Sequence, residues 1–335
     1  MFTGNISFQN KVPLMDESVI NWLMEGDPAI RWQVMRDLLD REKREVEAER
    51  QNVAVSGWGG QLLALQEPSG RWGGGIYSPK WVSTHYTLLT LRQLGLPPQD
   101  LQAKKACELL LESGYYKDGG INYFPKSQKY SETCITGMLL NLLAYFHFQD
   151  ERLDHIAAYL FGQQMEDGGW NCESYRGAKH SSFHTTMSVL EGLRAYQKLK
   201  EAEIGRNVID AVINEAQGRG GEFLLAHRLF RSHRTGEIID ERMLRFPFPP
   251  RWRYDILRAL DYFRELGEGS KGRRRDERMR EAIEVVIKKR LSDGRWPAHT
   301  GMSGQVYFIL EKAGQPGRWT TLRALRVLKW WEAGS

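Results

Sequence analysis

The sequence predicts an all-α fold assembled from helical-hairpin repeats. Two observations lead to this prediction. A glycine-containing turn recurs at a constant spacing, and the segments between the turns carry apolar residues three and four positions apart, as a buried helix face requires. Patterns typical of strands are almost absent. Because no Gly/Ser-rich or Pro-rich linker separates the repeats, we expect the array to close into one unit.

The recurring turn has the pattern Q-x-x-x-G-x-W. Two segments carry it in full and two in degenerate form: QEPSGRW (66–72), QMEDGGW (164–170), RLSDGRW (290–296) and YYKDGGI (115–121). Trp72, Ile121 and Trp170 are 49 residues apart (121 − 72 and 170 − 121). In such a turn the glycines allow left-handed backbone geometry and the glutamine can cap backbone groups, so its role is structural.

Between the turns, each repeat is expected to hold one nearly buried helix and one amphipathic helix. The buried helices are expected within STHYTLLTLRQL (83–94), SETCITGMLLNLLAYF (131–146), SFHTTMSVLEGLRAY (182–196), RWRYDILRALDYF (251–263) and RWTTLRALRVLKW (318–330). Residues 98–113 and 150–164 are examples of the more polar partner.

The chain divides into two parts. Residues 27–50 predict a helical hairpin that begins with Asp27 as N-cap and Pro28 at the first helical position. We therefore expect an N-terminal helical hairpin, residues 1–54, packed on a repeat array that spans 55–335. Residues 227–246 are extra to the repeat and form an insertion within the array.

Composition excludes several classes of protein. No apolar run reaches 18 residues, so no transmembrane segment is expected, and residues 1–19 lack the pattern of a signal peptide. Three cysteines, an odd number, favour free thiols in a reducing compartment, and we expect a cytoplasmic protein. The net charge of +5 comes in part from residues 271–280, which we interpret as a solvated helix start, so no nucleic-acid partner is expected.

The turns, followed by helices that begin in polar residues, resemble the prenyltransferase and squalene-oxidase repeat family over roughly residues 55–333. The resemblance implies an α/α toroid, in which inner helices line a cavity and outer helices wrap them. It also implies a prenyltransferase-like or terpene-cyclase-like protein that acts on an isoprenoid or other apolar substrate. The D-x-D-D and D-D-x-x-D motifs of that family are absent, since the chain has no Asp-Asp pair. Fold alone does not name a reaction.

The protein prenyltransferases in this family hold a zinc ion with an aspartate, a cysteine two residues later and a histidine one repeat on. Here Glu132 and Cys134 match the first two, with glutamate in place of aspartate. His184 follows Cys134 by 50 residues and His85 precedes it by 49. The resemblance therefore implies zinc as a cofactor, held by Glu132, Cys134 and His184, with His85 as a fourth ligand. Oxygen, sulfur and nitrogen ligands with one open position are typical of catalytic zinc.

Further residues near this group have expected roles. Lys126 and Lys129 precede Glu132 with the family's spacing of cations that bind diphosphate. Cys172 and His180 are additional soft ligands on the following loop. An ordinary helix start, with Cys134 in the core and both histidines at the rim, is the structural alternative.

The aromatic and basic residues supply the remaining candidates. Trp81 and Trp252, together with Tyr86, Tyr254 and Trp319, are expected to form an aromatic wall for a prenyl chain. Three arginines are candidate substrate-binding residues: Arg231, Arg234 and Arg253. Asp255 is either a general acid or one half of a buried ion pair with Arg253 or Arg258.

Three functions therefore stay open. The first is a metal-assisted enzyme that acts on an apolar or prenyl-diphosphate small molecule. The second is a non-catalytic binder of apolar ligands, or a scaffold, with the same fold. The third is a carbohydrate-active toroid, in which Tyr254, His233 and Arg234 would supply the catalytic groups if the insertion folds inward. A partner subunit cannot be read from the chain.

Overall fold

The computed structural model describes residues 13–201, 207–267 and 275–333. Within these ranges every regular element is helical, and the extended backbone is limited to isolated bridges such as Trp72–Gly75 and Arg231–Ile238. The first 12 residues and part of the basic run 271–280 lie outside the described residues. Across the described ranges, no helix combines the length and the apolar character that crossing a membrane requires.

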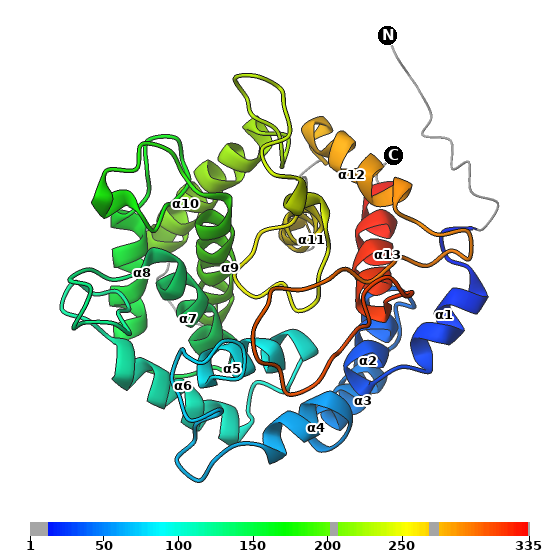
Figure 1. Ribbon diagram of the computed structural model, residues 1–335, viewed down its shortest axis with the longest axis horizontal. Helices are drawn as coiled ribbons and strands as arrows, with labels where there is room; N and C mark the ends of the chain where they lie inside the picture. Colours follow the sequence, from blue (N-terminus) through cyan, green and yellow to red (C-terminus); the bar gives the residue numbers. More distant parts are fainter. Residues whose placement is uncertain (1–12, 202–206, 268–274, 334–335) are drawn as a thin grey trace.

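The helices form two concentric layers around a central axis, which confirms the predicted α/α toroid (Figure 1). The inner layer consists of α2 (Pro28–Asp37), α5 (Thr84–Leu94), α7 (Thr133–Tyr145), α9 (Phe183–Lys200), α11 (Ile256–Gly267) and α13 (Arg318–Glu332). The outer layer consists of α1 (Glu17–Met24), α3 (Lys43–Val55), α4 (Gly57–Ala64), α6 (Leu101–Gly114), α8 (Arg152–Gly162), α10 (Asn207–Ala226) and α12 (Arg280–Lys288). Three short 3₁₀ turns complete the set: η1 (Ser174–Arg176), η2 (Glu241–Leu244) and η3 (Glu277–Met279).

The helix from the N-terminal hairpin takes a place in the inner ring. Asp27 caps α2 by accepting the Ala29 N–H at 2.9 Å, as the sequence predicts. The indole N–H of Trp32 then donates to the carbonyl of Leu94 at the end of α5, at 2.9 Å. On the other side, Arg326 of α13 donates to Gln33 at 2.9 Å. Helix α2 therefore closes the ring between the first and last repeats.

Two kinds of hydrogen bond recur where a tryptophan-containing turn joins an outer helix to the next inner helix. The indole N–H groups of Trp72, Trp170 and Trp296 each donate to a carbonyl in the last turn of the preceding outer helix, all at 2.7 Å. Each of these carbonyls also accepts a longer bond, of 3.2 or 3.3 Å, from the backbone N–H of the residue that ends its helix, so the indole adds a second, shorter bond at the helix C-terminus. In the third turn Arg290 replaces the glutamine and donates to the Gly294 carbonyl at 3.0 Å, as Gln164 does to Gly168 at 2.7 Å.

A close helix contact lies between α7 and α9. A β-carbon on Gly192 would come within 2.4 Å of the Gly137 carbonyl oxygen, and one on Gly137 would come within 2.8 Å of the Ser188 carbonyl oxygen. Only glycine allows the two backbones to approach this closely. The pair therefore fixes the spacing of the two inner helices on this side of the ring.

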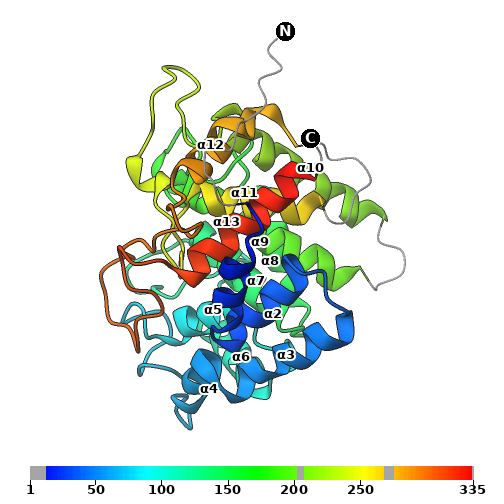
Figure 2. The ribbon, with the colours of Figure 1, turned by 90° about the vertical axis from the view of Figure 1, so that its right-hand side faces the viewer.

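The inner helices run in the same direction, so the toroid has two different ends. Asp255, just before α11, and Asp261 within it pair with Arg323 and Arg326 of α13, respectively, in the same order along both helices. The N-terminal ends of the inner helices therefore face one opening, and their C-terminal ends face the other. In side view, the long loops that precede the inner helices gather on one face of the molecule (Figure 2).

Candidate functional site

A cavity with a volume of about 500 Å³ is lined mainly by the inner helices of the toroid. We call it the central cavity. Most of its wall comes from the C-terminal halves of α2, α5, α7, α9 and α11, and α13 contributes its first half. Aromatic side chains form part of this wall: Trp32, Tyr145, Phe248, Tyr262 and Trp319. Its size is in the range of small-molecule sites in proteins.

The wall of the central cavity is strongly cationic. It contains the side chains of Arg36, Arg50, Arg92, Arg194, Lys198, Arg258, Arg323 and Arg326, against the carboxylates of Glu191, Asp261 and Glu265. Eight cations face three carboxylates in the wall, and part of this excess is balanced by Asp37 and Asp255, which pair with Arg36 and Arg323 from outside the lining. Such an excess in a partly enclosed space attracts anions.

Several of these arginines are held by carboxylates. Arg258 binds Glu191 with two nitrogens, at 2.8 and 2.7 Å. Arg326 pairs with Asp261, which Arg264 also binds at 2.8 Å. Burial alone would raise the pKa of Glu191, but the charge and hydrogen bonds of Arg258 outweigh it, and the net shift is downward. Paired arginines of this kind stabilise the ring and are not free to bind a ligand.

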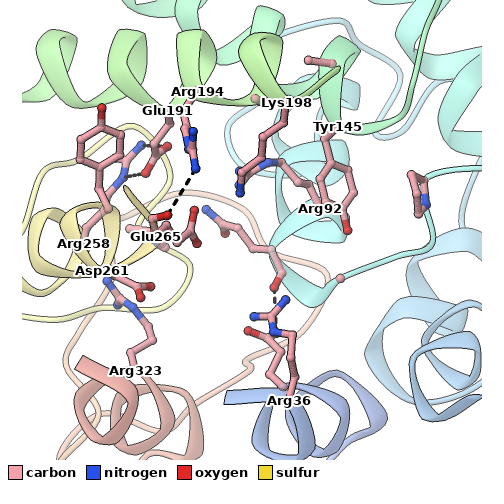
Figure 3. A pocket seen from close by; sticks show the side chains of 18 of the residues that line it. Arg36, Arg92, Tyr145, Glu191, Arg194, Lys198, Arg258, Asp261, Glu265 and Arg323 are labelled. Atoms are coloured by element: carbon pink, nitrogen blue, oxygen red, sulfur yellow. Dashed lines mark hydrogen bonds and ion pairs between the residues drawn. The ribbon is translucent and has the colours of Figure 1, made fainter. Parts of the chain in front are cut away.

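Three cations in the wall have no such partner. Across the described residues, no carboxylate lies within ion-pair distance of Arg92, Arg194 or Lys198. The Arg92 guanidinium lies over the ring of Tyr145, with its carbon 5.4 Å from the ring centroid, and its buried Nε has no hydrogen bond. Arg194 makes only long contacts of 3.4 Å, and its Nε is also unpaired. Figure 3 shows these side chains projecting into the cavity.

The orientation of the helices explains why cations are favoured here. The C-terminal end of a helix carries a partial negative charge, and the parallel inner helices bring several such ends to one side of the ring. Arg92 lies in the last turn of α5, and Lys198 in the last turn of α9. Dipoles offset part of the cost of gathering these cations. They do not supply the hydrogen-bond acceptors that the Nε atoms of Arg92 and Arg194 lack.

A second cavity of about 440 Å³ lies toward the N-terminal ends of the inner helices. Its outer wall is the segment 299–313, between α12 and α13, which we call the strap. The strap crosses toward the start of α5, where the Trp81 N–H donates to the Gln305 carbonyl at 2.8 Å and the Gln305 N–H donates to the Lys80 carbonyl at 2.9 Å. Of the lining residues, Phe248 is shared with the central cavity, and its ring stacks on Trp319 with centroids 3.9 Å apart.

The predicted zinc ligands hold equivalent helix positions but do not converge. His85, Cys134 and His184 are each the second residue of their inner helix. His184 accepts the Tyr254 backbone N–H through Nδ1 at 2.8 Å, while the Cys134 backbone N–H donates to the sulfur of Cys172 at 3.1 Å.

His85 and Glu132 complete the predicted set. His85 is fully buried, its ring lies 5.3 Å from that of Tyr77, and burial lowers its pKa to about 3. Burial is also the main reason that the pKa of Glu132 is raised. Within the described ranges, no three His, Cys, Asp or Glu side chains form a group suited to a metal ion. These residues therefore do not fit a zinc ion in this arrangement, and the zinc hypothesis stays a prediction.

A difference in register explains the position of His85. In α7, α9 and α13, a threonine hydroxyl accepts a backbone N–H of the preceding turn, and this threonine is the fourth residue of the helix. In α7 it is Thr136, which accepts the Ile121 N–H at 3.0 Å. In α5 the corresponding threonine, Thr84, is the first helical residue. Relative to this threonine, helix α5 therefore begins three residues later than the other three helices. This shift turns His85 away from the direction in which Cys134 points.

The other predicted residues near the N-terminal ends have partners of their own. Tyr254 is buried and its hydroxyl donates to the Leu229 carbonyl at 2.6 Å. Asp255 caps α11 by accepting the Arg258 N–H at 2.8 Å and pairs with Arg323 at 3.3 Å, so its partner differs from the expected Arg253 or Arg258 side chain. Burial raises the pKa of Asp255 against the charge of Arg323.

Of the residues predicted to contact the substrate, Trp319 lines the central cavity and Trp81 borders the second. Arg253 and the half-buried Trp252 lie beside each other, with the guanidinium carbon 6.0 Å from the ring centroid. Lys126 and Lys129 are exposed on the loop before α7, and Lys129 donates to the Pro125 carbonyl at 3.1 Å.

The insertion does not fold into the central cavity. Arg231 binds Glu281 of α12 at 2.8 Å, which ties the insertion to the outer layer. His233 contacts the ring nitrogen of His227 at 2.9 Å, and His233 and Arg234 are both exposed. Cys107 is buried in α6, in agreement with its interpretation as a core residue.

The arginines of the central cavity were missed by the sequence analysis, although a signal for them exists. Four inner helices contain the pattern Leu-Arg-x-Leu/Tyr: LRQL (91–94), LRAY (193–196), LRAL (257–260) and LRAL (322–325). Each places an arginine inside an apolar helix, at Arg92, Arg194, Arg258 and Arg323, and all four line the cavity. A charged residue within each of several apolar helices of the same ring points to a shared interior space.

Comparisons with known proteins find likeness at low similarity. No protein-family model matches the sequence, and no curated protein does. Among solved structures, a protein from Actinoplanes is 16% identical, with a TM-score of 0.46, over 91% of this chain and 90% of that one. The type II terpene cyclase MstE from Scytonema is 14% identical in complex with its substrate geranylgeranyl dihydroxybenzoate, with a TM-score of 0.33, over 85% and 97% of the two chains. Its apo structure is 15% identical, with a TM-score of 0.32, over 84% and 96%. At these TM-scores the likeness decides nothing about function.

Proposed function

We propose that this protein binds an anionic, amphipathic small molecule in the central cavity, and that prenyl diphosphates are the substrate class. The observation that carries the proposal is the set of three cations without carboxylate partners, Arg92, Arg194 and Lys198, in a wall that also contains aromatic rings. A phosphate or diphosphate supplies the acceptors that these donors lack.

The aromatic side chains support the isoprenoid part of the proposal. The stacked pair Phe248 and Trp319 and the ring of Tyr145 form apolar surface next to the cations. An apolar chain gains free energy when it is buried against such rings, and a developing carbocation is attracted to their faces. The resemblance of the recurring turns to those of the prenyltransferase and squalene-oxidase repeat family is consistent with this class.

Two carboxylates of the central cavity are not suited to act as the general acid of cyclase-type chemistry. These two, Glu191 and Asp261, are held by arginines that bring the pKa below its ordinary value although burial acts in the opposite direction. Both are therefore ionised at neutral pH and cannot protonate an alkene. This observation favours either ionisation of a diphosphate leaving group, stabilised by the free cations, or binding without turnover as the second candidate function.

Isothermal titration calorimetry with farnesyl diphosphate and the uncharged alcohol farnesol tests the proposal. We expect the diphosphate to bind at least tenfold more tightly, since each charge-assisted hydrogen bond contributes about 1.5–3 kcal/mol. Arg92→Gln and Arg194→Gln should each remove most of that difference. The exposed Lys179→Gln, on the loop before α9, is the control and should retain it.

Equal affinity for the two ligands, or a preference for the diphosphate that survives both arginine substitutions, would refute the proposal. Mass spectrometry of the same mixtures separates the two candidate functions. Release of diphosphate identifies an enzyme, and recovery of intact farnesyl diphosphate identifies a binder.

A further inference from the structure

The second cavity contains a buried arginine that the proposed function does not use. Arg251 is 8% exposed and lines this cavity opposite the strap. Its guanidinium carbon lies 4.4 Å from the centroid of the Trp81 ring. Among the residues that the structure describes, no carboxylate pairs with this guanidinium and no hydrogen bond satisfies it.

The absence of a partner is costly for a buried cation. Desolvation lowers the pKa of Arg251 to about 10, which still leaves the group charged at neutral pH. Buried charges in proteins are normally paired, because the attraction of Trp81 alone replaces only part of the lost hydration. The nearest carboxylate in the wall, Glu311, is occupied by the Trp319 N–H at 2.7 Å and the Thr320 hydroxyl at 3.2 Å.

The rest of the wall is largely apolar. Aromatic and aliphatic side chains surround the space next to the arginine: Leu62, Trp81, Phe248, Met302, Tyr307 and Phe308. The strap also exposes apolar groups beside the cavity, since Ile309 is 75% exposed and Val306 is 45% exposed. Polar groups also border the cavity, among them Thr87, His299 and the occupied carboxyl group of Glu311. A buried cation without a partner, next to this apolar surface, is complementary to a ligand with a single compact anionic group on an apolar body.

We propose that the second cavity is a binding site for such an amphipathic anion, a carboxylate or a phosphate monoester on an apolar chain, with Arg251 as its counter-ion. The anionic group accepts the guanidinium N–H groups, and the chain lies between the strap and Trp81. This site is separate from the central cavity and goes beyond the proposed function, since the two linings share only Phe248.

The experiment measures the affinity of decanoate, decyl phosphate and the uncharged decanol by calorimetry, for the full chain and for Arg251→Gln and Arg251→Lys. We expect both anions to bind the unmodified protein at least tenfold more tightly than decanol. Arg251→Gln should abolish this preference, and Arg251→Lys should keep part of it because the charge remains.

The melting temperature of Arg251→Gln without ligand provides a second readout. If the role of Arg251 were purely structural, this substitution would lower the melting temperature. Removing an unpaired buried charge should leave the melting temperature of Arg251→Gln equal to or above that of the unmodified protein. A lower melting temperature with an unchanged preference for anions would show that Arg251 only supports Trp81, and would overturn the inference.

The location of the bound anion is settled by Arg194→Gln, in the central cavity. If decanoate binding is lost in Arg194→Gln and kept in Arg251→Gln, the anion binds in the central cavity and the inference is wrong. If farnesyl diphosphate fails to bind in the central cavity while decanoate still depends on Arg251, the proposed function fails and this inference stands.

Discussion

The carboxyl group of Glu311 should make the stability of this protein depend on pH in a defined window. Glu311 lies in the strap, and its two oxygens accept the Trp319 N–H and the Thr320 hydroxyl at the start of α13. Burial raises its pKa to about 7 from the model-peptide value of 4.5, although these hydrogen bonds and the charge of Arg323 act in the opposite direction. The substitution to consider is Glu311→Gln, which keeps the size and the acceptor oxygen and removes the titration.

The sign and size of the effect follow from proton linkage. Between pH 4.5 and 7 the folded protein retains the proton that the unfolded chain has released. Stability from this group is therefore fully present below pH 4.5 and is lost as the pH rises to about 7. A shift of about 2.5 units corresponds to about 3 kcal/mol at 1.36 kcal/mol per unit. We expect Glu311→Gln to match the unmodified protein below pH 4.5 and to be more stable by up to about 3 kcal/mol above pH 7.

Urea unfolding, followed by circular dichroism at half-unit steps from pH 4 to 8.5, measures this difference. The exposed Glu108 of α6 provides the matched control. The difference in the free energy of unfolding between Glu108→Gln and the unmodified protein should stay constant over the same pH range. Stability curves of the unmodified protein and Glu311→Gln that run parallel from pH 4 to 8.5 would refute the reasoning, because they would show that Glu311 releases its proton equally in the folded and unfolded states.

Two further predictions concern the ring itself. Gly192→Ala should lower the free energy of unfolding by at least 1–3 kcal/mol, about the cost of overpacking, because its β-carbon meets the Gly137 carbonyl oxygen. In the same urea assay Gly218→Ala, in α10 with nothing within 4 Å of its β-carbon, should instead stabilise by up to about 1 kcal/mol, and a gain at both positions would contradict the close contact. Arg326→Gln should destabilise by less than the roughly 3–5 kcal/mol of a fully unpaired buried charge, because Asp261 loses one arginine and keeps Arg264. The loss should shrink in the double variant with Asp261→Asn, and additive effects would show that the two side chains do not interact.

Local sequence was sufficient for the repeat and for most helices. The geometry of the recurring turn is local, since the indole N–H groups of Trp72 and Trp170 each reach a carbonyl ten residues before them. The same local signals placed Asp27 and Pro28 at the start of α2. The loss of the glutamine in the third turn did not disturb the turn, because the longer side chain of Arg290 reaches the same carbonyl.

Tertiary structure alone decided where the functional groups meet. Equal positions along α5, α7 and α9 predicted a common direction for His85, Cys134 and His184, but the late start of α5 turned His85 into the core. Which arginines are paired depends on contacts between helices: Arg258 reaches Glu191 across 67 residues of sequence, while Arg92 and Arg194 find no carboxylate. The sequence by itself thus determined the helices and turns, because these depend on neighbouring residues. Only the closed ring decided which charges remain free and which buried spaces they border, because charge pairing and burial depend on distances across the toroid.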